Sequence, residues 1–495
     1  LYDEGWNFET IRKENLFLQK VGNCEMDESL RERFKAEVRA MRAWTYLGMT
    51  MTFGKVPLIT EVLDYNSPNI PRDEVSVIRD FIMKELTEAA AILPEKYAGG
   101  YPNEKGRITK YACLSLKARA ALYFGDYALA ESTAKEVMDK GGFSLFKISS
   151  LSDAQKKEAE EMSLYIDFAE KGIDKDEFVK GMFNYEALWH TENANPDNPE
   201  YIMTRQYAAS SWNYQDMTRY TSMRPNQLGG WSSVTPTQNL VDAYWGVDGH
   251  SVPQLPTPEE RAKAYNQIKA DLDAYQKPEG EAKFIAFCQE KIKNGTLKDY
   301  KYIQEFRNRD SRMYVSILMP FKSWYESNYG DKFVYEWIKN GNNESKTGFN
   351  FRKMLSLEND ANGDGQATGD YPCIRYAEIL LIYAEAHTQT TGYDAATEAA
   401  LNQLRDRCGM PDVPSGLSKE EGLKLIQNER RIELAGEGFR GDDMTRYSDD
   451  YWKEHMNNVP IMTPDGDTEL TMKWSSRMRL KPIPQTAIDL NPLLA

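Results

Sequence analysis

The chain has 495 residues, and its 61 Lys+Arg against 76 Asp+Glu give a formal net charge of −15. This excess of acid disfavours binding to nucleic-acid phosphates and to anionic membrane surfaces. No apolar run reaches the roughly 18 residues that a membrane-spanning helix needs. The first residue is not Met and no targeting signal is visible, so we expect the chain to begin inside a longer precursor.

Helical patterns fill the N-terminal part of the chain. Ser29, with Glu32 three residues later, predicts a capping box for a long helix that stops near Gly54. Asp73 is the expected cap of the next helix, which Pro94 ends. Further helices are expected over 109–124 and 128–140, joined by a Gly-Asp-Tyr turn.

The middle of the chain differs in composition and in its predicted elements. A charged stretch over 158–180 predicts an exposed helical insertion, and residues 182–249 are rich in Asn, Ser, Trp, Tyr and Gly. Loops that long in a compact protein usually carry function. Residues 258–293 are helical again, and 306–369 mix aromatic residues with turns.

Helices resume over 374–390, 394–408 and 418–437, and a Pro-containing extended tail follows. Two helix–turn–helix pairs, around 118–134 and 382–400, carry Ala at contact spacing and resemble tetratricopeptide units. We therefore predict a mainly α fold of tetratricopeptide-like hairpins with an inserted loop-rich mixed α/β subdomain. The expected parts of this one compact unit are 1–145, 146–370 and 371–495.

The cysteine and histidine residues give little indication of metal binding or catalysis. Five scattered cysteines contain no CxxC, and we expect Cys113 and Cys408 to be buried in helices. The four histidines have no metal-ligand spacing, and neither HExxH nor GxSxG occurs. His387, on a strongly apolar helix, is expected to be a core residue with its hydrogen bonds satisfied. We predict that the protein is not an enzyme and requires no cofactor.

Loop aromatics with polar neighbours are the candidate ligand-binding residues. Sugars present an apolar ring face, which stacks on Trp or Tyr, and a rim of hydroxyls for amides and acids. The candidates are Trp212, Asn213 and Tyr214 with Trp231; Trp324, Tyr329 and Trp337; and Tyr65. The competing interpretation is that these rings pack onto the helical scaffold.

A short acidic loop matches a calcium-binding pattern. Oxygen ligands fall at Asp360, Asn362 and Asp364, a Gly follows, and the Gln366 carbonyl comes next, as in an EF-hand loop. The twelfth position is Tyr instead of Glu, but Asp370 is adjacent. A structural Ca²⁺ is one interpretation of this loop, and an Asx- and Gly-rich surface turn is the other.

Several blocks, in order along nearly the whole chain, resemble the SusD/RagB family of outer-membrane glycan-binding lipoproteins. They are Ala36–Tyr46 followed by Phe53–Ile59, Gly106–Lys110, Pro236–Tyr244 with Asp248-Gly249, Asn308–Arg312, Ile374–Ala386, Asn428–Ala435 with Glu437–Arg440, and a tail with Pro482-Ile483-Pro484 and Asn491-Pro492. The lipid-attachment Cys of the family is absent, because Cys24 lacks the apolar lead. Most of these blocks are scaffold, and we expect an ion-pair network of Arg375, Glu378, Glu429, Arg431 and Glu433.

The resemblance implies non-catalytic capture of an oligo- or polysaccharide at the extracellular face of the outer membrane. It implies anchoring by an N-terminal lipid outside this chain, and delivery of the ligand to a SusC-like TonB-dependent transporter. The family's ligand site lies in variable loops, so no site residue is carried over. Two alternatives stay open: a tetratricopeptide scaffold that binds a peptide or protein, and a glycoside hydrolase with two facing carboxylates.

Overall fold

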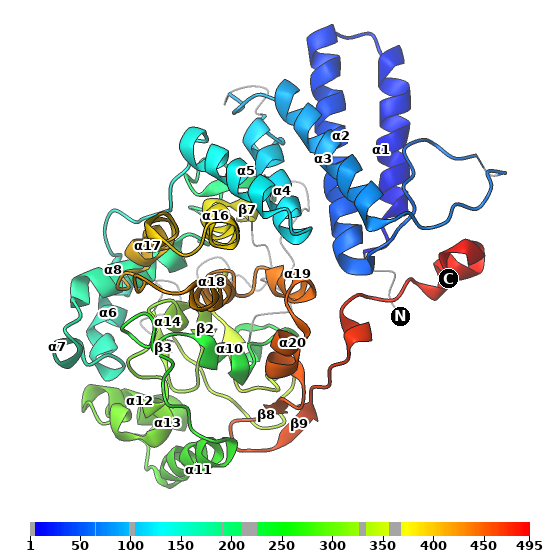
Figure 1. Cartoon of the computed structure of the whole chain (residues 1–495). Helices are drawn as coiled ribbons and strands as arrows, with labels where there is room; N and C mark the ends of the chain where they lie inside the picture. Colours follow the sequence, from blue (N-terminus) through cyan, green and yellow to red (C-terminus); the bar gives the residue numbers. More distant parts are fainter. Residues whose placement is uncertain are drawn as a thin grey trace.

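The computed structural model describes residues 5–64, 66–98, 104–190, 192–208, 225–325, 333–355 and 368–495. Helices dominate these residues, and the strands form short antiparallel pairs (Figure 1). The predicted mainly helical fold is confirmed.

The N-terminal helices pack in sequence order, each against the next. They are α1 (Phe8–Lys20), α2 (Glu28–Phe53), α3 (Val75–Ile92), α4 (Lys110–Tyr123) and α5 (Tyr127–Lys140), with the 3-10 helix η1 (Val21–Asn23) between the first two. The helix expected to begin at Thr109 is capped by that residue, whose side chain accepts a hydrogen bond from the Ala112 amide at 3.1 Å.

Two predicted caps are wrong by one or two residues. Asp27, not Ser29, caps α2: its carboxylate accepts a hydrogen bond from the Leu30 amide at 3.1 Å, and the Ser29 hydroxyl donates to the same carboxylate. The Asp73 carboxylate binds the Leu58 amide at 2.8 Å instead of capping α3. For α2, the acceptor two residues earlier takes the role. For α3, Glu74 occupies the N-cap position and its side chain makes no capping hydrogen bond.

The inserted part combines short helices with three of the strand pairs. Its helices are α6 (Asp153–Glu161), η2 (Met162–Leu164), α7 (Phe168–Lys171), α8 (Lys175–Ala187), η4 (Asn226–Leu228), α10 (Gln238–Ala243), α11 (Pro258–Ala274), α12 (Lys283–Lys293), η5 (Leu297–Asp299), α13 (Lys301–Gln304) and α14 (Met313–Ser316). The pairs are β1 (Tyr201–Arg205) with β7 (Tyr371–Arg375), β2 (Ile317–Leu318) with β6 (Asn350–Phe351), and β3 (Ser323–Trp324) with β5 (Phe333–Val334).

The charged stretch over 158–180 is not an exposed insertion. Helix α8, which begins inside it, packs against α17 and α14. The Glu158 carboxylate is buried between Lys322 at 2.5 Å and Arg352 at 2.6 Å. Partners distant in sequence neutralise this charge, so local charge density did not indicate exposure.

The C-terminal helices return to the N-terminal ones. They are α16 (Tyr376–Thr390), α17 (Ala395–Cys408), α18 (Lys419–Glu433), α19 (Phe439–Arg446), α20 (Asp449–Met456), η6 (Ser476–Met478), α21 (Gln485–Leu490) and η7 (Pro492–Leu494), with the strand pair β8 (Pro460–Met462) and β9 (Thr468–Thr471). Helix α16 packs against α5 as well as α17 and α18, so the two predicted hairpins lie side by side (Figure 1).

The extended tail runs back to the N-terminal helices, as the red trace of Figure 1 shows. The Lys481 amide donates to the Thr52 carbonyl at 2.8 Å, and the Asn491 amide side chain donates to the Ile70 carbonyl at 2.8 Å. These contacts tie the last part of the chain to α2 and to the loop after it.

Buried arginines and glutamates hold the C-terminal helices together. Arg375 contacts Glu437 at 2.6 Å, and Glu378 contacts Arg119 of α4 at 2.6 Å. The predicted network is therefore present, with one exception: Arg431 donates to the Asn239 carbonyl at 3.0 Å and forms no ion pair among the described residues.

Cys113 and Cys408 are buried as expected, and burial raises the pKa of the Cys408 thiol to about 11. His387 is also buried, with both ring nitrogens engaged by carboxylates.

Candidate functional site

Several predicted site residues lie outside the described residues. These are the glycan candidates Trp212, Asn213, Tyr214, Tyr329 and Tyr65, and the calcium candidates Asp360, Asn362, Asp364 and Gln366. They remain predictions.

Two predicted platform residues are core residues in the structure. Trp324 is 1% exposed, with the Arg352 guanidinium 4.9 Å from its ring centroid. Trp337 is 6% exposed, and its indole N–H donates to the Ser345 carbonyl at 2.9 Å. Neither ring offers a face to a sugar, because tertiary packing covers both.

Trp231 is presented differently, with 54% of its surface exposed. It follows the turn at Gly229, whose φ of +78° favours glycine, and its chain neighbours Gly230 and Ser232 are buried. The turn is held in place because the Gln227 side chain accepts a hydrogen bond from the Glu336 amide at 3.0 Å. A buried backbone thus holds an indole out toward solvent, which is the geometry of a stacking platform.

Asp370 is the one predicted calcium ligand among the described residues. It is buried, and its carboxylate accepts a hydrogen bond from the Tyr207 amide at 3.1 Å. Burial raises the pKa of Asp370, and hydrogen bonds from neighbours oppose that shift. Within the described ranges, no group of three His, Cys, Asp or Glu is arranged to hold a metal ion.

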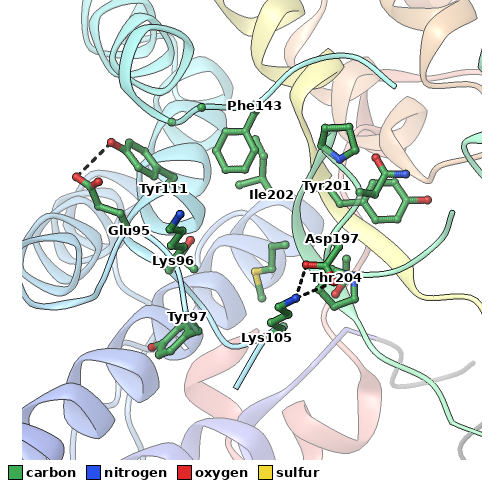
Figure 2. Close-up of a pocket in the computed structure, with 18 of the residues that line it drawn as sticks. Glu95, Lys96, Tyr97, Lys105, Tyr111, Phe143, Asp197, Tyr201, Ile202 and Thr204 are labelled. Carbon is green, nitrogen blue, oxygen red and sulfur yellow. Dashed lines mark hydrogen bonds and ion pairs between the residues drawn. The ribbon is translucent and has the colours of Figure 1, made fainter. Parts of the chain in front are cut away.

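A cavity of about 670 Å³ lies between the α3–α4 connection, the end of α5 and the segment that enters β1 (Figure 2). The first wall includes Tyr97 and Lys105, the second Phe143, and the third Asp197 and Thr204. Three segments far apart in sequence therefore form it, and its size suits a small ligand or a short oligomer.

Aromatic rings supply much of the cavity wall. Tyr97 and Phe143 are half-buried, whereas Tyr111 and Tyr201 are buried. The Phe143 ring stands edge-on to Tyr111, with centroids 6.1 Å apart. The Tyr97 hydroxyl donates to Glu37 at 2.9 Å, which fixes the orientation of its ring. These rings are held rigidly, as recognition of a flat apolar face requires.

Paired charges form the rim of the cavity. Lys105 contacts Asp197 at 2.5 Å, and Glu95 contacts Lys110, which lies outside the wall, at 3.0 Å (Figure 2 draws the first pair). The bond with Lys110 holds the pKa of Glu95 below its usual range. Such ionised, hydrogen-bonding groups around aromatic rings can bind hydroxyl groups.

The sequence prediction missed Tyr97 and Phe143. In the sequence, Gly99-Gly100 follow Tyr97 after one intervening residue, and Phe143 directly follows Gly141-Gly142. That shared pattern of an aromatic residue next to a glycine pair also marks Trp231, and it is the signal that could have found them.

Comparison with known proteins decides the family. A family model described as the SusD family matches residues 199–495. The chain belongs to the SusD family. The SusD-like protein P38 of Formosa agariphila is 21% identical to it over 453 residues, covering 89% of this chain and 70% of that protein.

Solved structures of the SusD family share its fold. A SusD-like protein from Bacteroides fragilis aligns with a TM-score of 0.73 and 25% identity, covering 100% of this chain and 85% of that one. A laminarin binding SusD-like protein aligns with a TM-score of 0.53 and 21% identity, covering 89% of this chain and 76% of that one. The predicted resemblance is confirmed. Among the described residues of this SusD-family chain, no helix has both the length and the apolar character to cross a membrane.

Proposed function

We propose that this SusD-family protein captures a neutral stretch of an extracellular glycan without cleaving it. The observation that carries the proposal is the cavity of Figure 2, in which the half-buried rings of Tyr97 and Phe143 stand beside a hydrogen-bonding rim. Trp231 supplies a second, more exposed stacking surface. The laminarin-binding relative supports a glycan as the ligand class.

The absence of cleavage is part of the proposal. A glycosidase needs one carboxyl group with a raised pKa to protonate the leaving group. In the cavity, Glu95 and Asp197 lie on opposite sides (Figure 2), and each is bonded to a lysine. The lowered pKa of Glu95 keeps that group ionised, so it suits binding rather than acid catalysis.

We further propose that the protein works at the extracellular face of the outer membrane, anchored by an N-terminal lipid outside this chain. The captured glycan would pass to a SusC-like TonB-dependent transporter. Membership of the SusD family supports both statements. The loop residues Trp212, Asn213, Tyr214, Tyr329 and Tyr65, and a structural Ca²⁺ at the 360–370 loop, remain candidate parts of this function.

The test is a glycan-array screen followed by calorimetric titration of the neutral oligosaccharides that bind, beginning with laminarin fragments. We expect Tyr97→Ala or Trp231→Ala to weaken binding at least about tenfold, as for aromatic residues at the centre of an interface. Trp231→Phe should restore part of the affinity, because it keeps a ring face. No shortened product should appear.

Tyr275→Ala is the matched control. Tyr275 is also half-buried, and its hydroxyl also donates to a glutamate, Glu290 at 2.8 Å. It lies in the α11–α12 region, away from the cavity. Unchanged binding in both Tyr97→Ala and Trp231→Ala, or no glycan binding by the folded protein, would reject the proposed site or function and favour a peptide ligand.

A further inference from the structure

A second cavity, of about 290 Å³, lies between α10, α18, α19 and the β8–β9 region. Three arginines line it: Arg430, Arg431 and Arg440. The rest of its wall is mostly apolar, from Leu240, Leu434, Phe439, Met456 and Met472. It has no residue in common with the cavity of Figure 2.

The positive charge in this cavity is only partly neutralised. Asp443 is the one carboxylate in its wall, and it contacts Arg430 at 2.8 Å and Arg446 at 2.9 Å. Arg431 donates to the Asn239 carbonyl at 3.0 Å, and Arg440 donates to the Tyr451 hydroxyl at 2.8 Å. Within the described part of the chain, the guanidinium groups of Arg431 and Arg440 therefore contact only neutral acceptors.

Arg430 also carries an unused donor. The residue is 3% exposed, and its Nη1 has no hydrogen-bond partner among the residues that the structure describes. A buried polar group without a partner is unfavourable and calls for an explanation.

The positive charge of the neighbouring Arg431 is also poorly compensated. Burial, and then the like charge of Arg440, lower the pKa of Arg431 to about 10. An arginine with a carboxylate partner is expected to show the opposite shift. The pKa of Arg430, which contacts Asp443, is indeed raised despite burial. An anion in the cavity would satisfy both arginines.

We propose that this arginine-lined cavity binds one carboxylate or sulfate group, carried by an acidic sugar. Guanidinium groups present paired N–H donors that can bind two oxygens of a carboxylate or a sulfate at once. Helix α19 begins at Phe439 in the wall, so the positive end of its dipole adds to the attraction. The apolar part of the wall can cover the face of one sugar ring.

The position of the cavity favours a sugar as the carrier of the charge. Val234, in its wall, is exposed and lies three residues after Trp231. Three residues of extended chain span at most about 11 Å. An oligosaccharide stacked on Trp231 therefore lies close enough for its further units to extend to the wall of this cavity. The choice of an acidic sugar rests on the proposed function, whereas the anion site does not.

The test is calorimetric titration with D-glucuronate, D-glucose and acetate at low ionic strength. We expect glucuronate to bind at least tenfold more tightly than acetate, and glucose not to bind. Arg431→Gln and Arg440→Gln should each weaken glucuronate binding at least tenfold. Arg79→Gln, which changes a half-exposed arginine paired with Asp80 on α3, is the control and should leave glucuronate binding unchanged.

Each outcome bears on one part of the proposal. Acetate binding as tightly as glucuronate, with loss in Arg431→Gln, would overturn the acidic sugar as the carrier. No binding of either anion, or binding that survives both variants in proteins that melt as the wild type does, would overturn the anion site. The neutral-glycan site is tested separately, by the effect of Tyr97→Ala on the binding of neutral oligosaccharides. A failure of the anion site can therefore be distinguished from a failure of the proposed function.

Discussion

Nη1 of Arg375 lies 2.8 Å from Oε1 of Glu433, and both side chains are shut off from solvent. Arg312 approaches the same carboxylate at 3.0 Å, and Arg407 binds it as well. Burial alone would raise the pKa of Glu433, but the three guanidinium groups outweigh it and hold the pKa far below the usual range. One carboxylate thus joins β7, α17 and α18 to the segment before α14.

We expect Glu433→Gln to lower the free energy of unfolding by about 3–5 kcal/mol, because it leaves buried arginines with less negative charge than they need. Urea denaturation followed by circular dichroism measures the change. Glu420→Gln is the control on the same helix: Glu420 forms an exposed pair with Lys424 at 2.9 Å, and its loss should leave the midpoint unchanged. Equal midpoints for the two variants would contradict the importance of the buried network.

The same network predicts sensitivity to acid. Arginine partners lower the pKa of Glu429, Glu433 and Glu437 despite their burial. A carboxyl group whose pKa is lowered on folding stabilises the protein above its pKa in the unfolded chain, which is about 4.3 for Glu. That stabilisation is lost as the pH falls toward its pKa in the folded protein. We expect the urea midpoint to drop as the pH is lowered below about 4.5, with a shallower slope in Glu433→Gln. A midpoint independent of pH between 5 and 3 would be the contrary result.

Close packing of α8 against the end of α17 gives a separate prediction. A Cβ built on Gly181 would lie 2.1 Å from the Cys408 carbonyl carbon and from the Gly409 nitrogen, both of which are backbone atoms. Since backbone cannot yield as a flexible side chain does, Gly181→Ala should destabilise the protein by about 1–3 kcal/mol or more.

Gly48→Ala is the matched control for Gly181→Ala. Gly48 lies within α2, and a Cβ there would meet nothing within 4 Å. We expect this variant to stabilise the protein by about 0.5–1 kcal/mol, because alanine is the better helix former. Differential scanning calorimetry should therefore show shifts of opposite sign. A loss of stability in both variants would mean that the contact at Gly181 is not the cause.

Much of the fold could be predicted from the sequence, because local signals determine where helices start and stop. Thr109, Asp394 and Ser418 cap the helices that their positions predict. The prediction failed at Ser29, where Asp27 lies within reach of the same backbone amides. Sequence spacing does not distinguish two acceptors two residues apart, because the direction of the incoming chain decides between them.

The candidate site was harder to predict. Trp231 and Trp324 both lie in aromatic, turn-rich sequence, yet one is exposed and the other belongs to the core. The difference arises from tertiary contacts such as Arg352 over the Trp324 ring. The cavity of Figure 2 depends on segments around Tyr97, Phe143 and Asp197, and nothing in a single sequence indicates that these meet.

His387 predicts a change of stability at neutral to alkaline pH. Its Nδ1 lies 2.7 Å from Glu131 of α5, and its Nε2 lies 3.1 Å from Asp394, the cap of α17. Burial alone would lower the pKa of His387, but these two carboxylates outweigh it and raise the pKa. The charged imidazole therefore links three helices, since His387 itself belongs to α16.

Because the pKa of His387 is raised on folding, its contribution to stability decreases as the pH rises. The stabilisation is fully present below about pH 6.5, the pKa of histidine in the unfolded chain. It is lost as the pH rises through the pKa of His387 in the folded protein. We expect the melting temperature of the wild type to fall between pH 6.5 and 8.5, and His387→Gln to remove that part of the fall. His250→Gln, at an exposed position, should keep the wild-type slope. Identical slopes for wild type and His387→Gln would show that the charged form of His387 does not hold these helices together.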